Sequence, residues 1–345
     1  MEENLDKDTN LEPETGVENP IEEGFSPIVN KFEKERSLIQ KVKDIFASIV
    51  IGQEDIIDKM LICLIADGHV LLEGVPGIAK TLSARTLAQT INTEFKRIQF
   101  TPDLMPADIL GTSIYNLKDS SFEFQKGPIF SNIVLIDEIN RAPAKTQSAL
   151  FEAMEEKQVS FDGNSLALSF PFMVIATQNP VEQEGTYRLP EAQLDRFLMK
   201  IILEYPSPTE ELKILKRYKN QVGKIDLSNL EAVMSPDIIK KLQEVSAHIQ
   251  VEDQMLNYIT TLVQETRNNA KIYLGASPRA SLGLLKCSKI IAMMSGRNFV
   301  IPDDIQYIAP DILNHRIILS PEAEMARETP MSVIREIIQK VEVPR

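Results

Sequence analysis

Short runs of apolar residues alternate with helical patterns between about residue 35 and residue 205. The runs short enough to be strands are Val70–Glu73, Phe95–Phe100, Ile133–Ile136, Phe172–Ala176 and Lys200–Leu203. A strand that is apolar throughout is buried on both faces, which is typical of a parallel sheet covered by helices on each side. The pattern therefore predicts an α/β fold for this part of the chain.

Pro206 and Pro208 end this alternation, and the chain beyond them has helical periodicity with almost no strand signal. Prolines stand at or near several of the helix starts, where the first turn tolerates them. The predicted helices are Glu210–Tyr218, Asp237–Val251, Gln254–Asn269, Pro278–Ser295, Pro302–Asn314 and Pro330–Val341. We therefore expect an α/β core over residues 35–207 and an all-α C-terminal lid domain over residues 208–345.

The beginning of the chain differs in composition from the rest. Residues 1–30 contain nine acidic side chains, one lysine and three prolines, which is too polar a composition to bury a core. We expect residues 1–34 to form a disordered acidic N-terminal tail. It either keeps the protein in solution or contacts a partner.

Composition excludes several classes of protein. No run of 18 apolar residues occurs, so we expect no membrane insertion, and the first residues lack the basic and apolar regions of a signal peptide. Cys63 and Cys287 fall inside predicted helices, which favours reduced core thiols of a cytoplasmic protein. The net charge of −13 argues against broad nucleic-acid binding, which requires a basic surface.

A glycine-containing loop follows the first predicted strand and leads into a helical segment. Backbone N–H groups of such a loop, and the positive end of the following helix, bind phosphate. The spacing of Gly74, Lys80 and Thr81 fits the phosphate-binding motif G-x-x-x-x-G-K-[ST], although Ala79 stands before the lysine. We expect Lys80 to contact the β- and γ-phosphates and Thr81 to be a Mg²⁺ ligand. The loop residues expected to contact the nucleotide are Gly74, Val75, Pro76, Gly77, Ile78 and Ala79.

Two later strands also end in polar side chains. Asp137 and Glu138 follow one of them and Asn179 follows the next, at the edge of the sheet where α/β proteins bind ligands. We expect Asp137 to orient Mg²⁺ or its waters, and Glu138 to polarise the water that attacks the γ-phosphate. Asn179 would hydrogen-bond the γ-phosphate or that water. The structural alternatives are a capped turn after a core strand and an Asn-Pro turn.

These residues together carry a resemblance to a known family. The phosphate loop, Asp137-Glu138, the segment ATQNP (Ala176–Pro180) and the segment LPEAQLDRF (Leu189–Phe197) resemble the MoxR family of AAA+ ATPases. The resemblance covers about residues 36–345. It implies an AAA+ P-loop core with a helical lid, ATP and Mg²⁺ as cofactors, and tolerance of alanine at position 79.

The resemblance also implies roles for residues outside the phosphate loop. Asn179 is similar to the sensor-1 residue, and Arg279 to the sensor-2 arginine at the start of a lid helix. Arg196 stands where related ATPases have an arginine finger that acts on the neighbouring subunit's nucleotide. The segment that contains Gly52 and Gln53 resembles one that lies near the adenine.

Guanidinium groups suit this chemistry because their forked hydrogen bonds can stabilise charge on a transferring phosphoryl group. The residues alone leave simpler readings open. Arg196 could form a surface ion pair with Asp195 or Glu191, and Arg279 could be a surface charge at a helix start.

Two insertions have the pattern of β-hairpins. Turn residues separate each pair of short strand-like pieces, and Asp162-Gly163 is a strong hairpin signal. The pieces are Thr112–Leu117 with Ser121–Gln125, and Val159–Phe161 with Leu166–Leu168. They resemble the helix-2 insert and the pre-sensor-1 hairpin of related ATPases. Tyr115, Leu117 and Phe122 could contact a substrate, or they could pack the hairpin onto the core.

The leading hypothesis is an ATP hydrolase that remodels protein partners. The family resemblance implies a chaperone acting as a homo-oligomeric ring, a hexamer, on proteins with von Willebrand factor A domains. The alternative is a nucleic-acid-associated AAA+ motor or loader, and a third reading is a scaffold that binds ATP but scarcely hydrolyses it. The set Lys80, Thr81, Asp137, Glu138, Asn179 and Arg196 argues against the scaffold.

We predict that Lys80→Ala abolishes nucleotide binding, because the β- and γ-phosphate charge loses its counterion. Isothermal calorimetry with ATP measures this directly. An affinity equal to that of the unsubstituted chain would contradict the assignment of the loop.

Overall fold

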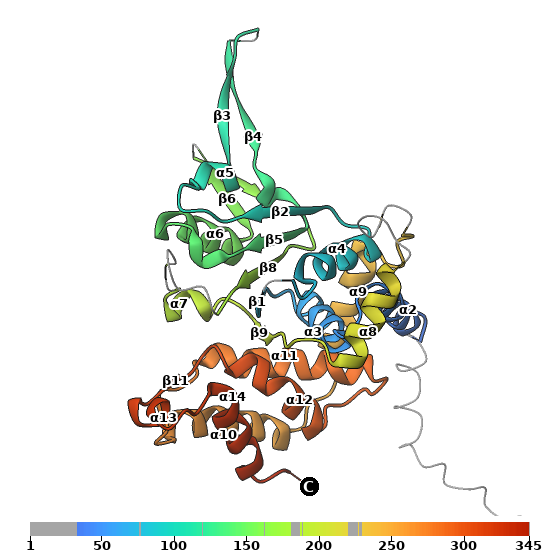
Figure 1. The fold of residues 1–345 in the computed structure, drawn as a ribbon, viewed down its shortest axis with the longest axis vertical. Coiled ribbons are helices and arrows are strands. Elements are labelled where there is room, and N and C mark those ends of the chain that lie inside the picture. Colours follow the sequence, from blue (N-terminus) through green and yellow to red (C-terminus); the bar gives the residue numbers. More distant parts are fainter. Residues whose placement is uncertain are drawn as a thin grey trace, which may run out of the picture.

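The computed structural model describes residues 33–344 except residues 76, 119, 162, 181–186, 188, 220–226 and 228–229 (Figure 1). Helix α2 (Glu33–Ile49) starts this part of the chain. The acidic tail predicted over residues 1–34 lies almost wholly outside the described residues.

The core is a five-stranded sheet with the strand order β2-β5-β8-β1-β9. All neighbouring strands are parallel, so the α/β prediction is confirmed. The strands are β1 (Val70–Glu73), β2 (Phe95–Gln99), β5 (Ile133–Asp137), β8 (Met173–Gln178) and β9 (Met199–Ile202). This order brings the carboxyl ends of β1, β5 and β8 next to one another.

Alternate side chains of the strands enter two separate hydrophobic clusters. Val70 and Leu72 belong to the cluster that includes α2, α3 and α4, whereas Leu71 belongs to the cluster that includes α5 and α6. Successive strand residues point to opposite faces, so helices cover both faces of the sheet. These helices are α3 (Glu54–Ile65), α4 (Lys80–Thr90), α5 (Pro106–Leu110) and α6 (Ala144–Glu156).

The C-terminal part is helical, as predicted, and most of its helices begin with proline. They are α8 (Pro208–Tyr218), α9 (Pro236–Ala247), α10 (Asp253–Asn268), α11 (Pro278–Met294), α12 (Pro302–Leu313), α13 (Pro321–Met325) and α14 (Pro330–Lys340). The pattern did not indicate two features: the short helix α13, and an antiparallel ribbon of β10 (Ile272–Leu274) and β11 (Ile318–Leu319). Strands of three and two residues are too short to show the alternation of apolar and polar residues by which a strand is recognised.

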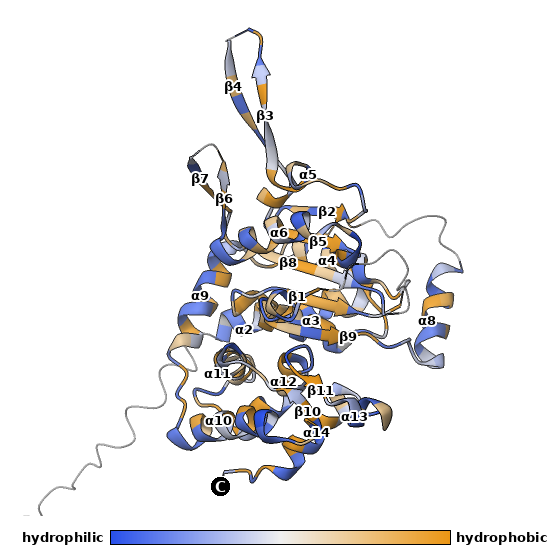
Figure 2. Ribbon diagram, turned by 90° about the vertical axis from the view of Figure 1, so that its left-hand side faces the viewer, coloured by the Kyte–Doolittle hydropathy of each residue, from blue (hydrophilic) through white to orange (hydrophobic). Residues whose placement is uncertain are grey.

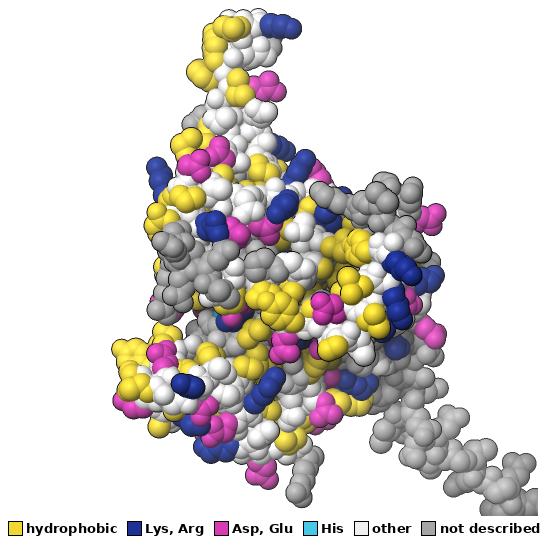
Figure 3. All heavy atoms as spheres, viewed as in Figure 1, with side chains coloured by type: hydrophobic (Ala, Val, Ile, Leu, Met, Phe, Trp, Pro, Cys, Tyr) yellow, Lys and Arg dark blue, Asp and Glu magenta, His cyan; other side chains and the backbone are white. Residues whose placement is uncertain are grey.

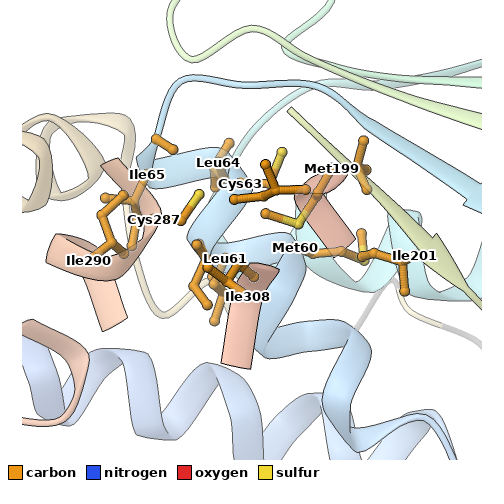
Figure 4. Close-up of a cluster of buried hydrophobic side chains, with 14 of the residues drawn as sticks. Met60, Leu61, Cys63, Leu64, Ile65, Met199, Ile201, Cys287, Ile290 and Ile308 are labelled. Carbon is orange, nitrogen blue, oxygen red and sulfur yellow. The ribbon is translucent and has the colours of Figure 1, made fainter. Parts of the chain in front are cut away.

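The lid and the core share one buried interior (Figure 4). Met60 and Cys63 of α3 meet Met199 of β9, and Cys287 of α11 and Ile308 of α12 reach the same cluster from the lid. Both cysteines are free and buried, which agrees with the prediction of core thiols. Burial raises the pKa of the Cys287 thiol to about 12.

Two hairpins project from one end of the core (Figures 1 and 2). They are β3 (Gly111–Asn116) with β4 (Ser121–Lys126), and β6 (Gln158–Phe161) with β7 (Asn164–Ala167). Asp119 and Asp162, in the two predicted turns, lie outside the described residues.

Tyr115, Leu117 and Phe122 do not pack the first hairpin onto the core. They are 47%, 84% and 73% exposed, so that alternative is wrong. Phe124 anchors the hairpin instead, because its ring lies 4.6 Å from that of Phe161 in the second hairpin.

Across the described ranges of the chain, no helix combines the length and the apolar character needed to cross a bilayer.

His69 connects the sheet to the end of helix α6. Its Nδ1 accepts a hydrogen bond from the backbone N–H of Val174 (3.0 Å), and its Nε2 lies 3.1 Å from the carbonyl oxygen of Met154. This pair of contacts suits a neutral ring that donates through Nε2. Burial lowers the pKa of His69 to about 4. The unfolded chain therefore binds this proton at a higher pH than the folded chain.

We predict that the free energy of unfolding decreases as the pH falls from about 6.5 towards 4, with His69 contributing about 3 kcal/mol. In His69→Gln this dependence should be weaker, although His315, whose pKa burial also lowers, retains its own contribution. Urea titrations at pH 7.5 and pH 5 measure the difference, of which about 2 kcal/mol should be seen by pH 5. His248→Gln, at an exposed histidine, is the control, and an unchanged slope in His69→Gln would contradict the prediction.

Candidate functional site

A cavity of about 480 Å³ opens at the carboxyl ends of the central strands. It brings together seven of the fifteen residues that the sequence assigned to nucleotide chemistry, including Lys80, Thr81, Asp137, Glu138 and Asn179. The described residues that line it are Gly77, Ala79, Lys80, Thr81, Leu82, Arg97, Gln99, Asp137, Glu138, Thr177, Asn179 and Tyr218. We refer to it below as the phosphate pocket.

The phosphate loop connects β1 to α4, as the pattern predicts. Lys80 is the first residue of α4, and its Nζ donates to the carbonyl oxygen of Gly74. Burial lowers the pKa of Lys80, and the carboxylates of Asp137 and Glu138 oppose that shift. The Lys80 ammonium group is therefore held against the loop near two carboxylates, where it can bind a phosphate. Pro76 lies outside the described residues.

Ala79 adopts a left-handed backbone conformation, with φ 61° and ψ 20°. Glycine adopts this conformation freely, whereas a Cβ makes it unfavourable by about 1 kcal/mol or more. The loop therefore retains the geometry that the motif's last glycine would give.

Asp137 ends β5, and each of its carboxylate oxygens accepts one hydrogen bond. One oxygen accepts from Arg97 Nε at 2.5 Å, and the other accepts from the hydroxyl of Thr177 at 3.2 Å. Asp137 and Thr81 both line the phosphate pocket, and their side chains offer the oxygen donors that a hard cation such as Mg²⁺ would take.

Glu138 has a strained backbone and a restrained side chain. Its φ is 58° and its ψ 53°, a conformation that costs a non-glycine residue about 1–3 kcal/mol. Its carboxylate accepts from Gln99 Nε2 at 2.9 Å and pairs with Arg141 Nε at 2.8 Å. The backbone N–H of Glu138 donates to Thr177. The Glu138 carboxylate is thus held between the end of β2 and the turn after β5, at the carboxyl edge of the sheet.

Asn179 follows β8 and lines the phosphate pocket, 8% exposed. Gly52 and Gln53 are not among the described residues that line this pocket. Gln53 Nε2 donates to the carbonyl oxygen of Glu204 at 3.2 Å, and a Cβ on Gly52 would lie 3.0 Å from Glu210. Both residues therefore stand beside the start of α8.

Arg196 and Arg279 lie apart from the phosphate pocket. Both bind Glu155, at the end of α6: Arg196 Nη2 at 2.9 Å and Arg279 Nη2 at 2.7 Å. Arg196 therefore has an ion pair, but with Glu155 and not with either partner considered from the sequence. The arginine pair lines a hollow of about 500 Å³ with Gly68, His69 and Leu198. Gly68 and His69 precede β1, and Leu198 precedes β9, so this hollow lies at the amino edge of the sheet.

Asp195 fixes the two arginines relative to each other. It accepts hydrogen bonds from Ser277, the N-cap of the helix that carries Arg279, and from the buried Arg316 at 2.8 Å. Arg316 also donates to the carbonyl oxygen of Phe197. The loop of Arg196 is therefore tied to the lid on both sides of the arginine.

The sequence reasoning missed Arg97, Gln99, Thr177, Arg141 and Glu155. Arg97 and Gln99 are two residues apart on β2, so both side chains lie on one face of this edge strand, which pairs with the strand of Asp137. Thr177 lies within the ATQNP segment. The sequence therefore contained the information needed to identify these three residues. No group of three or more His, Cys, Asp or Glu side chains suited to a metal ion occurs among the described residues.

Comparison with known proteins agrees with this geometry. Residues 69–199 match the model of the ATPase family associated with various cellular activities (AAA), and residues 264–337 match the AAA lid domain. The chain is 48% identical to the uncharacterized protein YeaC of Bacillus subtilis, covering 89% of this chain and 95% of that one. It is 44% identical to the chaperone MoxR1 of Mycobacterium tuberculosis, covering 86% and 80%.

A solved structure of a proposed ATPase from Cytophaga hutchinsonii is similar throughout. It aligns with a TM-score of 0.84 and 43% identity, covering 92% of this chain and 98% of that one.

We predict that Ala79→Gly raises the free energy of unfolding by about 0.5–1 kcal/mol, because the left-handed backbone no longer carries a Cβ. Thermal or urea unfolding measures it. Ala84→Gly, inside α4, is the matched control and should destabilise the protein. A loss of stability in both variants would contradict this account of the loop.

Proposed function

The chain belongs to the MoxR family of AAA+ ATPases, and from this premise we propose that it hydrolyses ATP to remodel protein clients. We propose that it does so as a homo-oligomeric ring, a hexamer, with each nucleotide bound between two subunits. The clients that the family resemblance implies are proteins with von Willebrand factor A domains.

One observation supports the shared site above all others. The phosphate loop stands at the carboxyl end of β1, and the hollow with Arg196 and Arg279 lies at its amino end. β1 has four residues and is therefore about 13 Å long. An arginine that binds Glu155 at one edge cannot reach phosphates at the other edge of its own sheet. A second copy is needed to bring the arginines to the nucleotide.

The residues of the phosphate pocket have distinct roles in the proposed hydrolysis. Lys80 neutralises the β- and γ-phosphates, and Thr81 with Asp137 would hold Mg²⁺, which would supply further positive charge. Glu138 accepts the proton of the attacking water, and Asn179 orients that water or the γ-phosphate. Since Gln99 and Arg141 hold the Glu138 carboxylate, the water must meet it in this fixed orientation.

The arginine pair completes the reaction in the proposed ring. Charge on the transferring phosphoryl group is spread over three oxygens, and two guanidinium groups from the neighbouring subunit can bind them. Turnover then depends on assembly, whereas nucleotide binding does not.

The first hairpin is the surface that we propose for clients. Its tip exposes Tyr115, Leu117 and Phe122, which suits an apolar protein surface. Basic residues near it are balanced by acidic ones, with Lys118 beside Asp119 and Lys126 near Glu123. That charge balance does not favour a nucleic-acid partner.

We predict that Arg196→Ala binds ATP normally but loses turnover by about 100-fold or more. Mixing it with Lys80→Ala should restore part of the activity, since some interfaces then combine an intact pocket with an intact arginine. Steady-state phosphate release measures both effects. Arg335→Ala, an exposed arginine on α14, is the control. Absence of rescue in verified mixed assemblies would contradict action between subunits.

A further inference from the structure

Helix α8 exposes its apolar face. Leu212, Leu215 and Tyr218 are 51%, 63% and 43% exposed, and their spacing of three residues places them on one side of the helix. No residue of α8 is buried. Hydrophobic side chains gather over α8 in the space-filling view (Figure 3). We call these three residues the α8 patch.

The α8 patch is held in place from the opposite side of the helix. Arg217 Nη1 donates to the carbonyl oxygen of Ile49 at 2.8 Å, and Ser207 caps the helix through a capping box with Glu210. An amphipathic helix normally turns its apolar face to the protein. Here Arg217 and the partly buried Ile214 lie on the inward side of α8, whereas the three side chains of the α8 patch are exposed and available to another molecule.

The α8 patch is continuous with the phosphate pocket. Tyr218 lines that pocket together with Lys80 and Thr81, so the patch starts at the pocket wall and extends along α8 away from it.

The hollow that contains Arg196 and Arg279 also exposes an apolar side chain. Leu282 is 61% exposed and lies three residues after Arg279 on α11, in the same hollow as Arg196. Residues three apart on a helix lie about 5–6 Å from each other on one face. Leu282 therefore lies on the same side of α11 as Arg279, and Tyr218 lies at the phosphate pocket that Arg279 of a neighbouring subunit would enter in the proposed ring.

We propose that the α8 patch is the docking surface for a second copy of this chain, and that it receives Leu282 of that copy. This inference rests on the proposed function, because it takes the arginines to act between subunits. The apolar contact then sets the position of Arg279 over the nucleotide and closes the pocket to water.

A charge substitution and its complement test the contact. Leu215→Glu and Leu282→Lys should each raise the protein concentration for half-maximal assembly at least tenfold. The double variant should regain most of the assembly, because each interface then pairs the two charges. Sedimentation velocity with a non-hydrolysable ATP analogue measures assembly, and a fluorescent ATP analogue verifies that each variant is folded. Leu256→Glu, an exposed leucine on α10, should assemble normally.

Assembly of Leu215→Glu at the unsubstituted concentration would overturn the proposal, as would single defects that the double variant does not relieve. Loss of client binding with intact assembly would assign the α8 patch to a client and would also overturn it. Failure of the proposed function has a different signature. In that case Arg196→Ala would keep full turnover, whatever the α8 variants do.

Discussion

The separation of the phosphate pocket from the arginine pair by the length of a parallel sheet is the constraint on which the rest of the structure depends. Phosphate-binding groups gather at the carboxyl edge because parallel strands end there together and leave their polar termini side by side. The arginine pair is fixed at the amino edge by Glu155 and Asp195. The buried strand β1 runs between the two edges. Neither set of groups can move to the other without unfolding the sheet.

Much of this arrangement could be predicted from the sequence. Each central strand is apolar on both faces, so its burial does not depend on register, and the polar residues after β5 and β8 could belong only to the carboxyl edge. Helix starts were readable because proline removes an N–H that the first turn does not use. The short β10–β11 ribbon could not be read, since so few residues carry no period.

Contacts between side chains from distant segments could not be predicted from the sequence. Nothing local distinguishes Glu155 from Glu152 or Glu156 on α6; only the tertiary fold places it between two arginines from different segments. The capture of Glu138 by Gln99 and Arg141 likewise depends on the strand neighbours and on a tight turn after β5. Exposure of the α8 patch is a further example, because the amphipathic pattern of α8 predicts a buried apolar face. Sequence periodicity identifies the face but not what covers it.

The contact between Phe124 and Phe161 has a mechanical consequence. Phe161 belongs to the hairpin that begins two residues after α6 ends, so the base of the longer hairpin rests on a segment continuous with that helix. The six residues of β3 form an arm of about 20 Å. A tilt of about 10° at the base would displace the tip by roughly 3 Å over such an arm. Helix α6 begins three residues after Arg141, which pairs with Glu138, and its last turn contains Glu155, which binds the two arginines. A movement of α6 at either charged site would therefore also move the base of the longer hairpin.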